Sequence, residues 1–475
     1  MKKINTCNDN IFALSTPVGG AIAVIRASGS GVLPVLREIF SGKIEHRMLN
    51  YGKITDGAGD GGKRESAEPV VLDEAMAVYF RAPHSYTGED MFELNLHGSY
   101  SVVSAVSRAL MRRGMRIAEA GEFTKRAFLN GKMDLVQADA VMDLINSETQ
   151  RGASAALEQL QGGLSRRIGE IEDELIDFAS ELAAAMDYPE EMEDEVLSAA
   201  PTVLNSAILR IRDLIDNGNC NKIIREGAKL AILGRPNVGK SSLLNALMNA
   251  ERAIVTDIAG TTRDVLEEKI DLLGLPVRIA DTAGIHETGD AVEQIGIERA
   301  LREAAAAECV LLLFDGAAGF TREDESLVQR VFEMHCRNVL FAINKCDLAD
   351  CCAAEAALKH FAPESAARTV RISCRTGFGL DELKRRIAEA VGLSEGRAIV
   401  TNERHIECLS AACAELSTAA ELFAGAENAD VILLPQTELV AESVGNALHC
   451  LGEISGREVS EELLDRIFER FCVGK

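Results

Sequence analysis

Apolar residues recur along the chain with two different periods, which predict regions of different structure. Short apolar runs separated by turn signals fill roughly the first 125 residues. Residues 21–25 (AIAVI) and 75–80 (AMAVYF) predict strands, residues 102–113 have helical spacing, and residues 57–62 (GAGDGG) indicate a loop. We therefore expect an α+β domain at the N-terminus.

Residues 135–224 read as helical almost throughout. Apolar residues at spacings of three and four form one long stripe, made of Leu157, Leu160, Leu164, Ile168, Ile171, Leu175 and Phe178. The acidic run at residues 190–195, which follows Pro189, indicates a bend or loop. Helical spacing resumes after residue 397 and continues to the end.

Between these helical regions the period changes, and short buried strands alternate with helical stretches. The strand runs are residues 230–233, 277–280, 310–314, 339–343 and 370–372. This alternation predicts a mostly parallel α/β sheet. We expect a multidomain α/β protein whose domains are residues 1–128, a helical domain of residues 129–225 and 393–475, and an inserted α/β domain at residues 226–392.

Composition narrows the classes of function. A net charge of −24 argues against bulk electrostatic binding to nucleic acid, and an aromatic content of 4% without Trp argues against wide base-stacking platforms. A basic segment at residues 108–132 is either a local patch or a solvated helix face. The N-terminus lacks a signal-peptide core, no apolar run approaches the ~18 residues of a membrane span, and the 12 Cys lack paired spacing. These features predict a cytoplasmic protein with free thiols and no membrane partner.

The first strand of the α/β region ends in a phosphate-binding motif. Residues 234–241 read GRPNVGKS between a strand and a helix, the context that a P-loop requires. Backbone N–H groups at the helix N-terminus would surround phosphates, Lys240 would reach the β- and γ-phosphates, and Ser241 would bind Mg²⁺. The residues expected to contact the nucleotide here are Asn237, Val238, Gly239, Lys240, Ser241 and Ser242.

Further motifs follow in the order that a GTP-binding domain requires. The carboxylate of Asp347 in NKCD offers two acceptors to the N1–H and 2-amino group of guanine, which adenine cannot satisfy. NKCD (residues 344–347) is accompanied by DTAG (281–284), by the SCR loop (373–375) and by a candidate first-switch segment (256–264). A purely structural turn is the alternative interpretation of the last segment. The residues expected to contact GTP in these motifs are Thr256, Asp257, Ile258, Ala259, Gly260, Thr261, Thr262, Asp281, Thr282, Ala283, Gly284, Asn344, Lys345, Cys346, Asp347, Ser373, Cys374 and Arg375.

The residue after DTAG departs from the pattern of Ras-like GTPases. It is Ile285, and an apolar side chain cannot orient the attacking water as Gln does. A monovalent cation beside Asn237 is one substitute for an arginine finger, and Arg235 and Arg263 remain candidates in cis. Glu293 is a candidate for orienting the water, the alternative being a solvated helix-surface Glu.

Several unrelated segments give the whole chain a resemblance to one family. They include AIAVIRASG at residues 21–29, SYTGED at 85–90, ELNLHG at 93–98, GEFTKRAFLNGK at 121–132, and the terminal FCVGK at 471–475. With the nucleotide motifs, the chain resembles the MnmE family, also called TrmE, of bacterial tRNA-modification GTPases. It departs from the family pattern at Ser99, where a second Gly is usual after His-Gly.

The resemblance implies an N-terminal domain that binds a reduced folate (5,10-methylene- or 5-formyl-tetrahydrofolate) and forms a homodimer. It implies G domains that meet across GTP in a potassium-dependent way, which stimulates hydrolysis. It also implies an FAD-containing partner, MnmG, which forms a heterotetramer with the dimer. Together they modify C5 of the wobble uridine of certain tRNAs with an aminomethyl or carboxymethylaminomethyl group.

The resemblance also assigns roles by position. Folate contacts fall on Arg26, Glu93, Lys132 and Lys475. Arg and Lys suit the glutamate carboxylates of a folate, and a Glu suits the donor edge of its pterin ring. The Mg²⁺ ligands are Ser241 and Thr262, the potassium ligands are Asn237, Thr256, Ile258 and Thr261, and the catalytic residues are Glu293, Lys240 and Cys472. A small buried apolar residue is the alternative role for Cys472.

Two other classes of protein share the nucleotide motifs. A ribosome-assembly GTPase of the Era or Der kind needs a KH-type domain or a second G domain, and this chain has one P-loop and no basic KH signature. A non-enzymatic scaffold that holds GTP as a structural ligand predicts damaged motifs, whereas all are intact here.

Overall fold

The structure is a computed structural model that describes residues 9–57, 69–187, 189–250, 268–280, 301–336, 338–391, 402–426 and 434–474. Tertiary contacts divide the chain into two compact units. One contains Met1–Met142 and Gly452–Lys475, and the other contains Asp143–Leu451. We expected residues 393–475 to belong entirely to the helical domain; the last part of that range groups instead with the N-terminal residues. The loop expected at residues 57–62 lies, after its first residue, outside the described residues.

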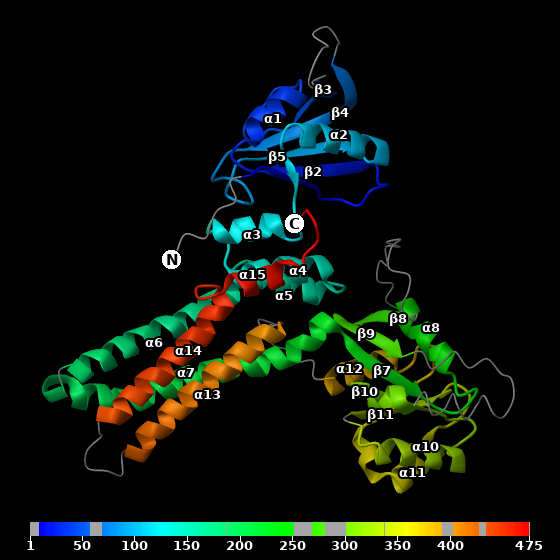
Figure 1. The fold of residues 1–475 in the computed structure, drawn as a ribbon. Helices are drawn as coiled ribbons and strands as arrows, with labels where there is room; N and C mark the ends of the chain where they lie inside the picture. The colour runs from blue at the N-terminus through cyan, green and yellow to red at the C-terminus, as the bar shows by residue number, and fades with distance from the viewer. Residues whose placement is uncertain are drawn as a thin grey trace. The chain divides into compact units, whose positions relative to one another are not determined.

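The first unit is built on a mixed sheet of order β3-β4-β5-β2-β1-β6. Its strands are β1 (Ile11–Leu14), β2 (Ile22–Ser28), β3 (Asn50–Asp56), β4 (Val70–Phe80), β5 (Met91–His97) and β6 (Arg116–Ile117). Alternate residues of β2 are buried (Ala23, Ile25 and Ala27), as a sheet with one covered face requires. Helices α1 (Val32–Ile39) and α2 (Tyr100–Arg112) cover that face (Figure 1). Ser99 caps α2 by accepting a hydrogen bond from the Val102 amide.

The C-terminal segment packs within the same unit. Helix α15 (Glu461–Phe468) shares an apolar cluster with α3 (Glu122–Leu129) and the first turns of α4 (Leu135–Asn146). Gly121, at the start of α3, has a left-handed φ of 64°, and a Cβ there would lie 2.8 Å from the Cβ of Phe471. A glycine is therefore needed for the chain end to approach α3.

Among the residues that the structure describes, the helical part of the second unit contains four long helices and one short helix. They are α5 (Gln150–Leu160), α6 (Gly163–Asp187), α7 (Pro189–Glu226), α13 (Glu403–Ala426) and α14 (Leu434–Ser455). Helix α7 packs against both α6 and α13. The helices that precede and follow the α/β region in sequence are thus neighbours, which is the arrangement expected of an inserted domain.

Two details of the helical prediction were wrong. The apolar stripe is divided between α5 and α6, because Gly162 takes a left-handed φ of 80° and ends the first helix; its first member, Leu157, is 45% exposed. The acidic run lies within α7 and not in a loop. Proline is compatible with the first position of a helix, and carboxylates near a helix N-terminus interact favourably with its dipole.

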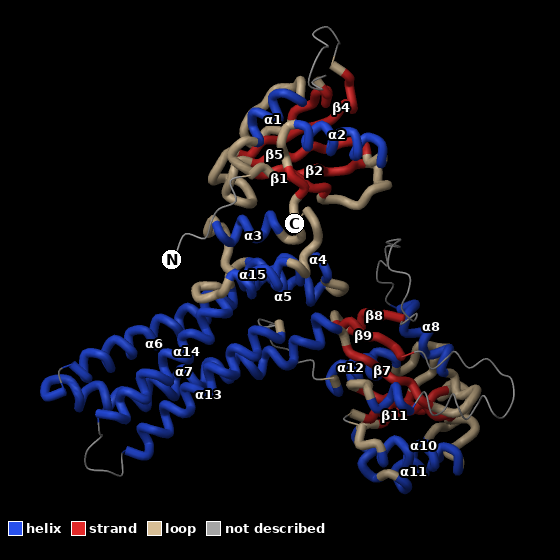
Figure 2. The backbone as a smooth tube through the Cα atoms, viewed as in Figure 1, coloured by secondary structure: helices blue, strands red, loops and turns tan. Residues whose placement is uncertain are grey.

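The α/β region has the expected mostly parallel sheet, of order β12-β11-β10-β7-β9-β8, with β8 antiparallel to β9. Figure 2 draws its strands in red. Its strands are β7 (Ala228–Leu233), β8 (Glu268–Leu272), β9 (Leu275–Ala280), β10 (Cys309–Asp315), β11 (Val339–Asn344) and β12 (Thr369–Arg371). Helices α8 (Lys240–Ala250) and α12 (Leu380–Ala390) cover one face, and α10 (Arg322–Glu333) and α11 (Cys352–Phe361) cover the other. The central strands are buried on both sides, which explains their unbroken apolar runs.

In the part of the chain that the structure describes, no helix combines the length and the apolar character that crossing a membrane requires.

Candidate nucleotide site and N-terminal pocket

The nucleotide motifs meet at the carboxyl edge of the parallel sheet. The P-loop follows β7, NKCD begins at the end of β11, and the SCR loop follows β12. In an open parallel sheet the loops after neighbouring strands lie together at this edge, where ligands usually bind. The order of the strands therefore brings together loops that are far apart in the sequence.

The P-loop has the backbone geometry of a phosphate cradle. Asn237 and Gly239 have positive φ angles of 62° and 105°, and a side chain at position 239 would collide with the amide of Asn344. The Lys240 Nζ donates to the carbonyl oxygens of Gly234 at 2.7 Å and Arg235 at 3.0 Å. Burial lowers the pKa of Lys240. An anionic phosphate would therefore stabilise the charged form of this amine.

The side chain of Asn344 joins three loops. Its Nδ2 donates to the Val238 carbonyl at 2.9 Å, and its Oδ1 accepts from the Cys374 amide at 3.1 Å. The side chain is almost fully buried, with 2% of the residue exposed. Buried amides that satisfy both ends hold their partners in one geometry.

The carboxylate of Asp347 is oriented before any base binds. Asp347 is exposed, and its Oδ1 accepts a hydrogen bond from Ser373 Oγ at 2.7 Å. Ser373 Oγ in turn accepts from the Thr376 amide at 3.3 Å. The SCR loop thus positions the group that is expected to select guanine.

Asp315 is a residue of this site that no sequence motif identified. The Lys345 Nζ donates to Asp315 Oδ2 at 2.6 Å and to the Asn237 carbonyl at 2.9 Å. Burial raises the pKa of Asp315, but the hydrogen bond from Lys345 and those from two backbone amides outweigh it, so the pKa is lowered overall. The sequence did contain one sign of this role, because Asp315 stands directly at the end of a buried strand.

Arg235 is already engaged by another part of the domain. Its Nε donates to Asp324 Oδ1 at 2.8 Å, and Asp324 is fully buried at 0% exposure. Asp324 also accepts from the backbone and side chain of Thr321 at the start of α10. Redirecting Arg235 to a phosphate would leave a buried carboxylate without this partner, which disfavours Arg235 as an arginine finger.

Some of the expected site residues lie outside the described residues. They are Thr256, Asp257, Ile258, Ala259, Gly260, Thr261, Thr262, Asp281, Thr282, Ala283, Gly284, Glu293 and Lys475. Arg263 and Ile285 are outside them as well. Ser241 and Ser242 are described and exposed at the start of α8.

A second site lies in the N-terminal unit. A pocket of about 360 Å³ is lined by Arg26, Arg47, Phe80, His84, Ser85, Tyr86, Met91, Glu93 and Lys132. Three of these residues were expected to contact folate, and they come from different elements: β2, β5 and the loop after α3. The volume is within the range of small-molecule sites, and the lining mixes aromatic, basic and acidic groups.

Arg26 and Glu93 face each other in this pocket. The Arg26 guanidinium contacts Glu93 Oε1 at 2.8 Å through both Nε and Nη2. It also lies over the rings of Tyr86 and Phe123, 5.3 Å and 5.9 Å from their centroids. These contacts fix the guanidinium plane, so the pocket presents a preformed charge pair.

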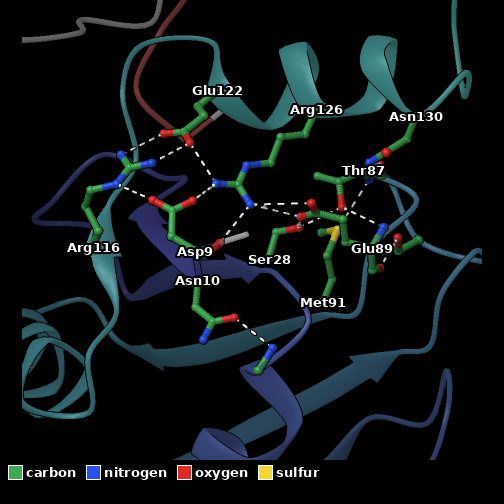
Figure 3. Close-up of polar contacts among 12 residues, drawn as sticks. Asp9, Asn10, Ser28, Thr87, Glu89, Met91, Arg116, Glu122, Arg126 and Asn130 are labelled. Carbon is green, nitrogen blue, oxygen red and sulfur yellow. Dashed lines mark hydrogen bonds and ion pairs between the residues drawn. The ribbon is translucent and has the colours of Figure 1, made fainter. Parts of the chain in front are cut away.

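A polar network centred on the buried Arg126 (Figure 3) adjoins one wall of the pocket. Arg126 donates to Asp9, Glu89 and Glu122. Glu89 also accepts from Ser28 Oγ at 2.7 Å. Because residues 85 and 86 of the adjoining segment line the pocket, this network anchors that wall to α3 and β2.

The basic segment at residues 108–132 is not an open patch. Arg112 and Arg113 pair with Asp56, Arg116 pairs with Asp9 and Glu122, and Lys125 pairs with Asp465. Most of its charge is therefore compensated within the unit. The segment is therefore neither a free basic patch for nucleic acid nor a simple solvated helix face.

Cys472 is exposed with a free thiol. The Gly121 amide donates to its carbonyl at 3.4 Å, and the next residue, Val473, forms a β-bridge with Ala120. The alternative role of a small buried apolar residue does not fit this exposure.

Comparison with known proteins identifies the family. The family model described as "MnmE helical domain" matches residues 135–472, and the one described as "GTP-binding protein TrmE N-terminus" matches residues 10–132. The chain belongs to the MnmE family. It is similar to proteins named tRNA modification GTPase MnmE from Aquifex aeolicus (40% identity, 98% of this chain and 99% of that one) and Moorella thermoacetica (41%, 98% and 100%). The protein is accordingly a GTP hydrolase.

The G domain also has solved neighbours. A structure of Era from Aquifex aeolicus is 26% identical, covers 40% of this chain and 66% of its own, and has a TM-score of 0.29. A score of this size adds nothing to the assignment, whereas the MnmE relatives match nearly the whole chain.

We expect Asp347→Asn to shift nucleotide preference from guanine toward xanthine. The amide replaces one acceptor with a donor, which clashes with the 2-amino group of guanine and suits the 2-oxo group of xanthine. Titration with fluorescent GDP and XDP analogues measures the two affinities. Unchanged affinity for the GDP analogue would remove this motif from the base site.

We expect Asp315→Asn to speed GDP release about ten-fold, because Lys345 loses a charge-assisted hydrogen bond worth roughly 1.5–3 kcal/mol. Stopped-flow release of a fluorescent GDP analogue measures the rate. Asp350→Asn, on the exposed loop before α11, is the matched control. Equal release rates for wild type and Asp315→Asn would contradict the role of Asp315.

We expect Arg126→Met to destabilise the N-terminal unit by about 1.5–3 kcal/mol, because it removes the charge-assisted hydrogen bonds that Arg126 donates to Glu89 and Glu122, while Arg116 still pairs with Glu122. Burial raises the pKa of Glu122, but hydrogen bonds from Arg116 and Arg126 lower it overall. The stability that depends on its ionised form is therefore present at neutral pH and lost as the pH falls through its folded-state pKa. Denaturant unfolding across pH tests this, with exposed Arg108→Met as the control that should change little.

Proposed function

We propose that the protein couples GTP hydrolysis to tRNA modification. With an MnmG-like FAD-containing partner, it adds an aminomethyl or carboxymethylaminomethyl group to C5 of the wobble uridine of certain tRNAs. The observation that carries the proposal is the N-terminal pocket, where Arg26, Glu93 and Lys132 meet although they are far apart in sequence. The names of the full-length relatives support the tRNA assignment. Because these relatives match nearly the whole chain, they also argue against the alternative of a ribosome-assembly GTPase of the Era or Der kind.

The pocket fits a reduced folate by its chemistry. A folate combines a flat pterin that donates hydrogen bonds with a tail of carboxylates, and bound there it would supply the one-carbon unit. Glu93, to which Arg26 is bonded, suits the pterin donors, and Lys132 suits a carboxylate of the tail. Lys132 Nζ donates to the Pro83 carbonyl at 3.1 Å, a contact to a neutral group that a carboxylate would readily replace.

The hydrolysis mechanism follows from the charge that the transition state develops on the phosphate oxygens. Arg235 is held by Asp324, which favours another source of positive charge. We assign potassium to Asn237, Thr256, Ile258 and Thr261, where it would supply that charge. Ser241 and Thr262 are the proposed Mg²⁺ ligands, and Glu293 would orient the attacking water.

The dimer that we propose has two parts. The N-terminal domain forms a constitutive homodimer, and the G domains meet only when GTP and potassium are bound. The exposed Asn237 side of the P-loop would lie in that second interface. Cys472, exposed at the chain end, is a candidate for a role in the modification step.

Mass spectrometry of wobble nucleosides tests the function as a whole. We expect cells that lack this protein to accumulate wobble uridines without the C5 group, and the wild-type gene to restore it. An unchanged nucleoside profile would sink the proposal. The Asp347→Asn protein is a matched variant, and it should fail to restore the modification when GTP is the available nucleotide.

For the pocket, we expect Lys132→Gln and Arg26→Gln to weaken binding of 5-formyl-tetrahydrofolate. Each lost contact to a charged group should cost on the order of 1.5–3 kcal/mol. Lys132→Gln is the cleaner variant, because Arg26 also pairs with Glu93. Isothermal calorimetry measures the affinity, with Arg108→Gln as control. Absence of binding by the wild-type protein would refute the folate assignment.

For hydrolysis, we expect turnover to be much faster in KCl than in NaCl at equal ionic strength, and to rise with protein concentration. Asn237→Ala should lose the cation dependence but still bind GTP. Glu293→Ala should lose turnover but still dimerise in potassium, because it acts on the water. Equal wild-type rates in the two salts would rule out this mechanism.

A further inference from the structure

Two cysteines of the guanine site lie in direct contact. Cys346 is the third residue of NKCD, and Cys351 immediately precedes α11. Their sulfur atoms are 2.7 Å apart, closer than unbonded sulfur atoms normally approach. Both are free thiols. Only four residues lie between them, so one short loop brings the pair together.

Packing holds Cys351 in place. The residue is 2% exposed and lies in an apolar cluster with Ile343 and Ala354, against which Cys346 also packs. Its sulfur lies over the backbone of Gly316, where a side chain would collide with it. Cys351 therefore cannot turn away from its partner without disturbing β10, β11 and α11.

We propose that Cys346 and Cys351 form a site of reversible oxidation, at which a peroxide produces a disulfide that weakens guanine-nucleotide binding. The inference rests on the GTPase domain and is independent of the folate and tRNA assignments. The proposal does not include the neighbouring Cys352. That residue is exposed, and its thiol is hydrogen-bonded to the side chain of Asp350.

The reaction balances with hydrogen peroxide as the oxidant. Cys346, the more exposed of the two, is oxidised to a sulfenic acid with release of one water. The Cys351 sulfur then attacks the sulfenic sulfur; the S–O bond breaks, and the thiol proton leaves with the oxygen as a second water. Peroxide gains the two electrons that the two thiols lose. A dithiol reductant reverses the change by exchange.

Burial and the adjacent Cys346 thiol raise the pKa of Cys351 to about 12. Cys351 is therefore protonated at neutral pH and is a poor first target for peroxide, because thiolates are the reactive form. In the second step, the contact between the two sulfur atoms offsets the low reactivity of the protonated Cys351 thiol.

The bond would act on nucleotide binding through the residues on either side of Cys346. A disulfide of about 2.05 Å draws the sulfurs together, and the fixed position of Cys351 requires the Cys346 segment to move. Lys345 is held to Asp315 at 2.6 Å, and Asp347 to Ser373 at 2.7 Å. These short contacts tolerate little displacement, so guanine affinity falls.

The test uses the full-length protein. Reduced protein is treated with hydrogen peroxide, remaining thiols are alkylated, and peptides are mapped by mass spectrometry. Affinity for a fluorescent GDP analogue is measured before oxidation, after it, and after a dithiol reductant. We expect a Cys346–Cys351 disulfide and a reversible loss of affinity of at least about ten-fold.

Two serine variants separate this site from general oxidative damage. Cys352→Ser should behave as wild type, and Cys351→Ser should keep its affinity after peroxide. Wild-type peptides that lack the Cys346–Cys351 bond, or that pair Cys346 with Cys374 instead, overturn the proposal. So does a disulfide that leaves affinity unchanged, or an equal loss in Cys351→Ser. The peptide map of the wild type decides the matter even if a variant folds poorly.

Discussion

The nucleotide site depends on one buried amide. Asn344 joins the P-loop, through the Val238 carbonyl, to the SCR loop, through the Cys374 amide. Position 239 requires glycine, because the Asn344 amide occupies the space that a Cβ would need. Each loop alone has many conformations, but a single side chain that bonds to two of them allows only one arrangement. The phosphate cradle and the base site are thereby set at a constant separation.

Charge compensation organises both candidate sites. In the nucleotide domain, Asp315 orients Lys345, and Asp324 holds Arg235 in an ion pair. In the N-terminal unit, Arg126 gathers three carboxylates behind the wall of the pocket. A buried charge without a partner is costly, so each of these side chains has a restricted direction.

The pattern of apolar residues predicted most of the strands and helices of the core, and each error in that prediction has a specific physical cause. The parallel strands were predictable because both of their faces are buried, which makes their apolar runs unbroken. The stripe from Leu157 to Phe178 was divided because Gly162 adopts a left-handed φ, which a spacing count does not register. The terminal residues joined the N-terminal unit because Phe468 and Phe471 pack near Gly121, a contact between chain ends that periodicity cannot reveal.

By itself the sequence determined the nucleotide chemistry, because GRPNVGKS and NKCD carry their function in consecutive residues. It indicated the family through further segments along the whole chain, such as SYTGED and GEFTKRAFLNGK. It also named Arg26, Glu93 and Lys132 by resemblance. Only the tertiary structure decided that these three share one pocket, that Asp315 belongs to the base site, and that the basic segment pairs with acidic residues elsewhere in its unit. The physical reason is that these are pairings across strands and loops, and their partners are chosen by sheet order and packing, which no local pattern encodes.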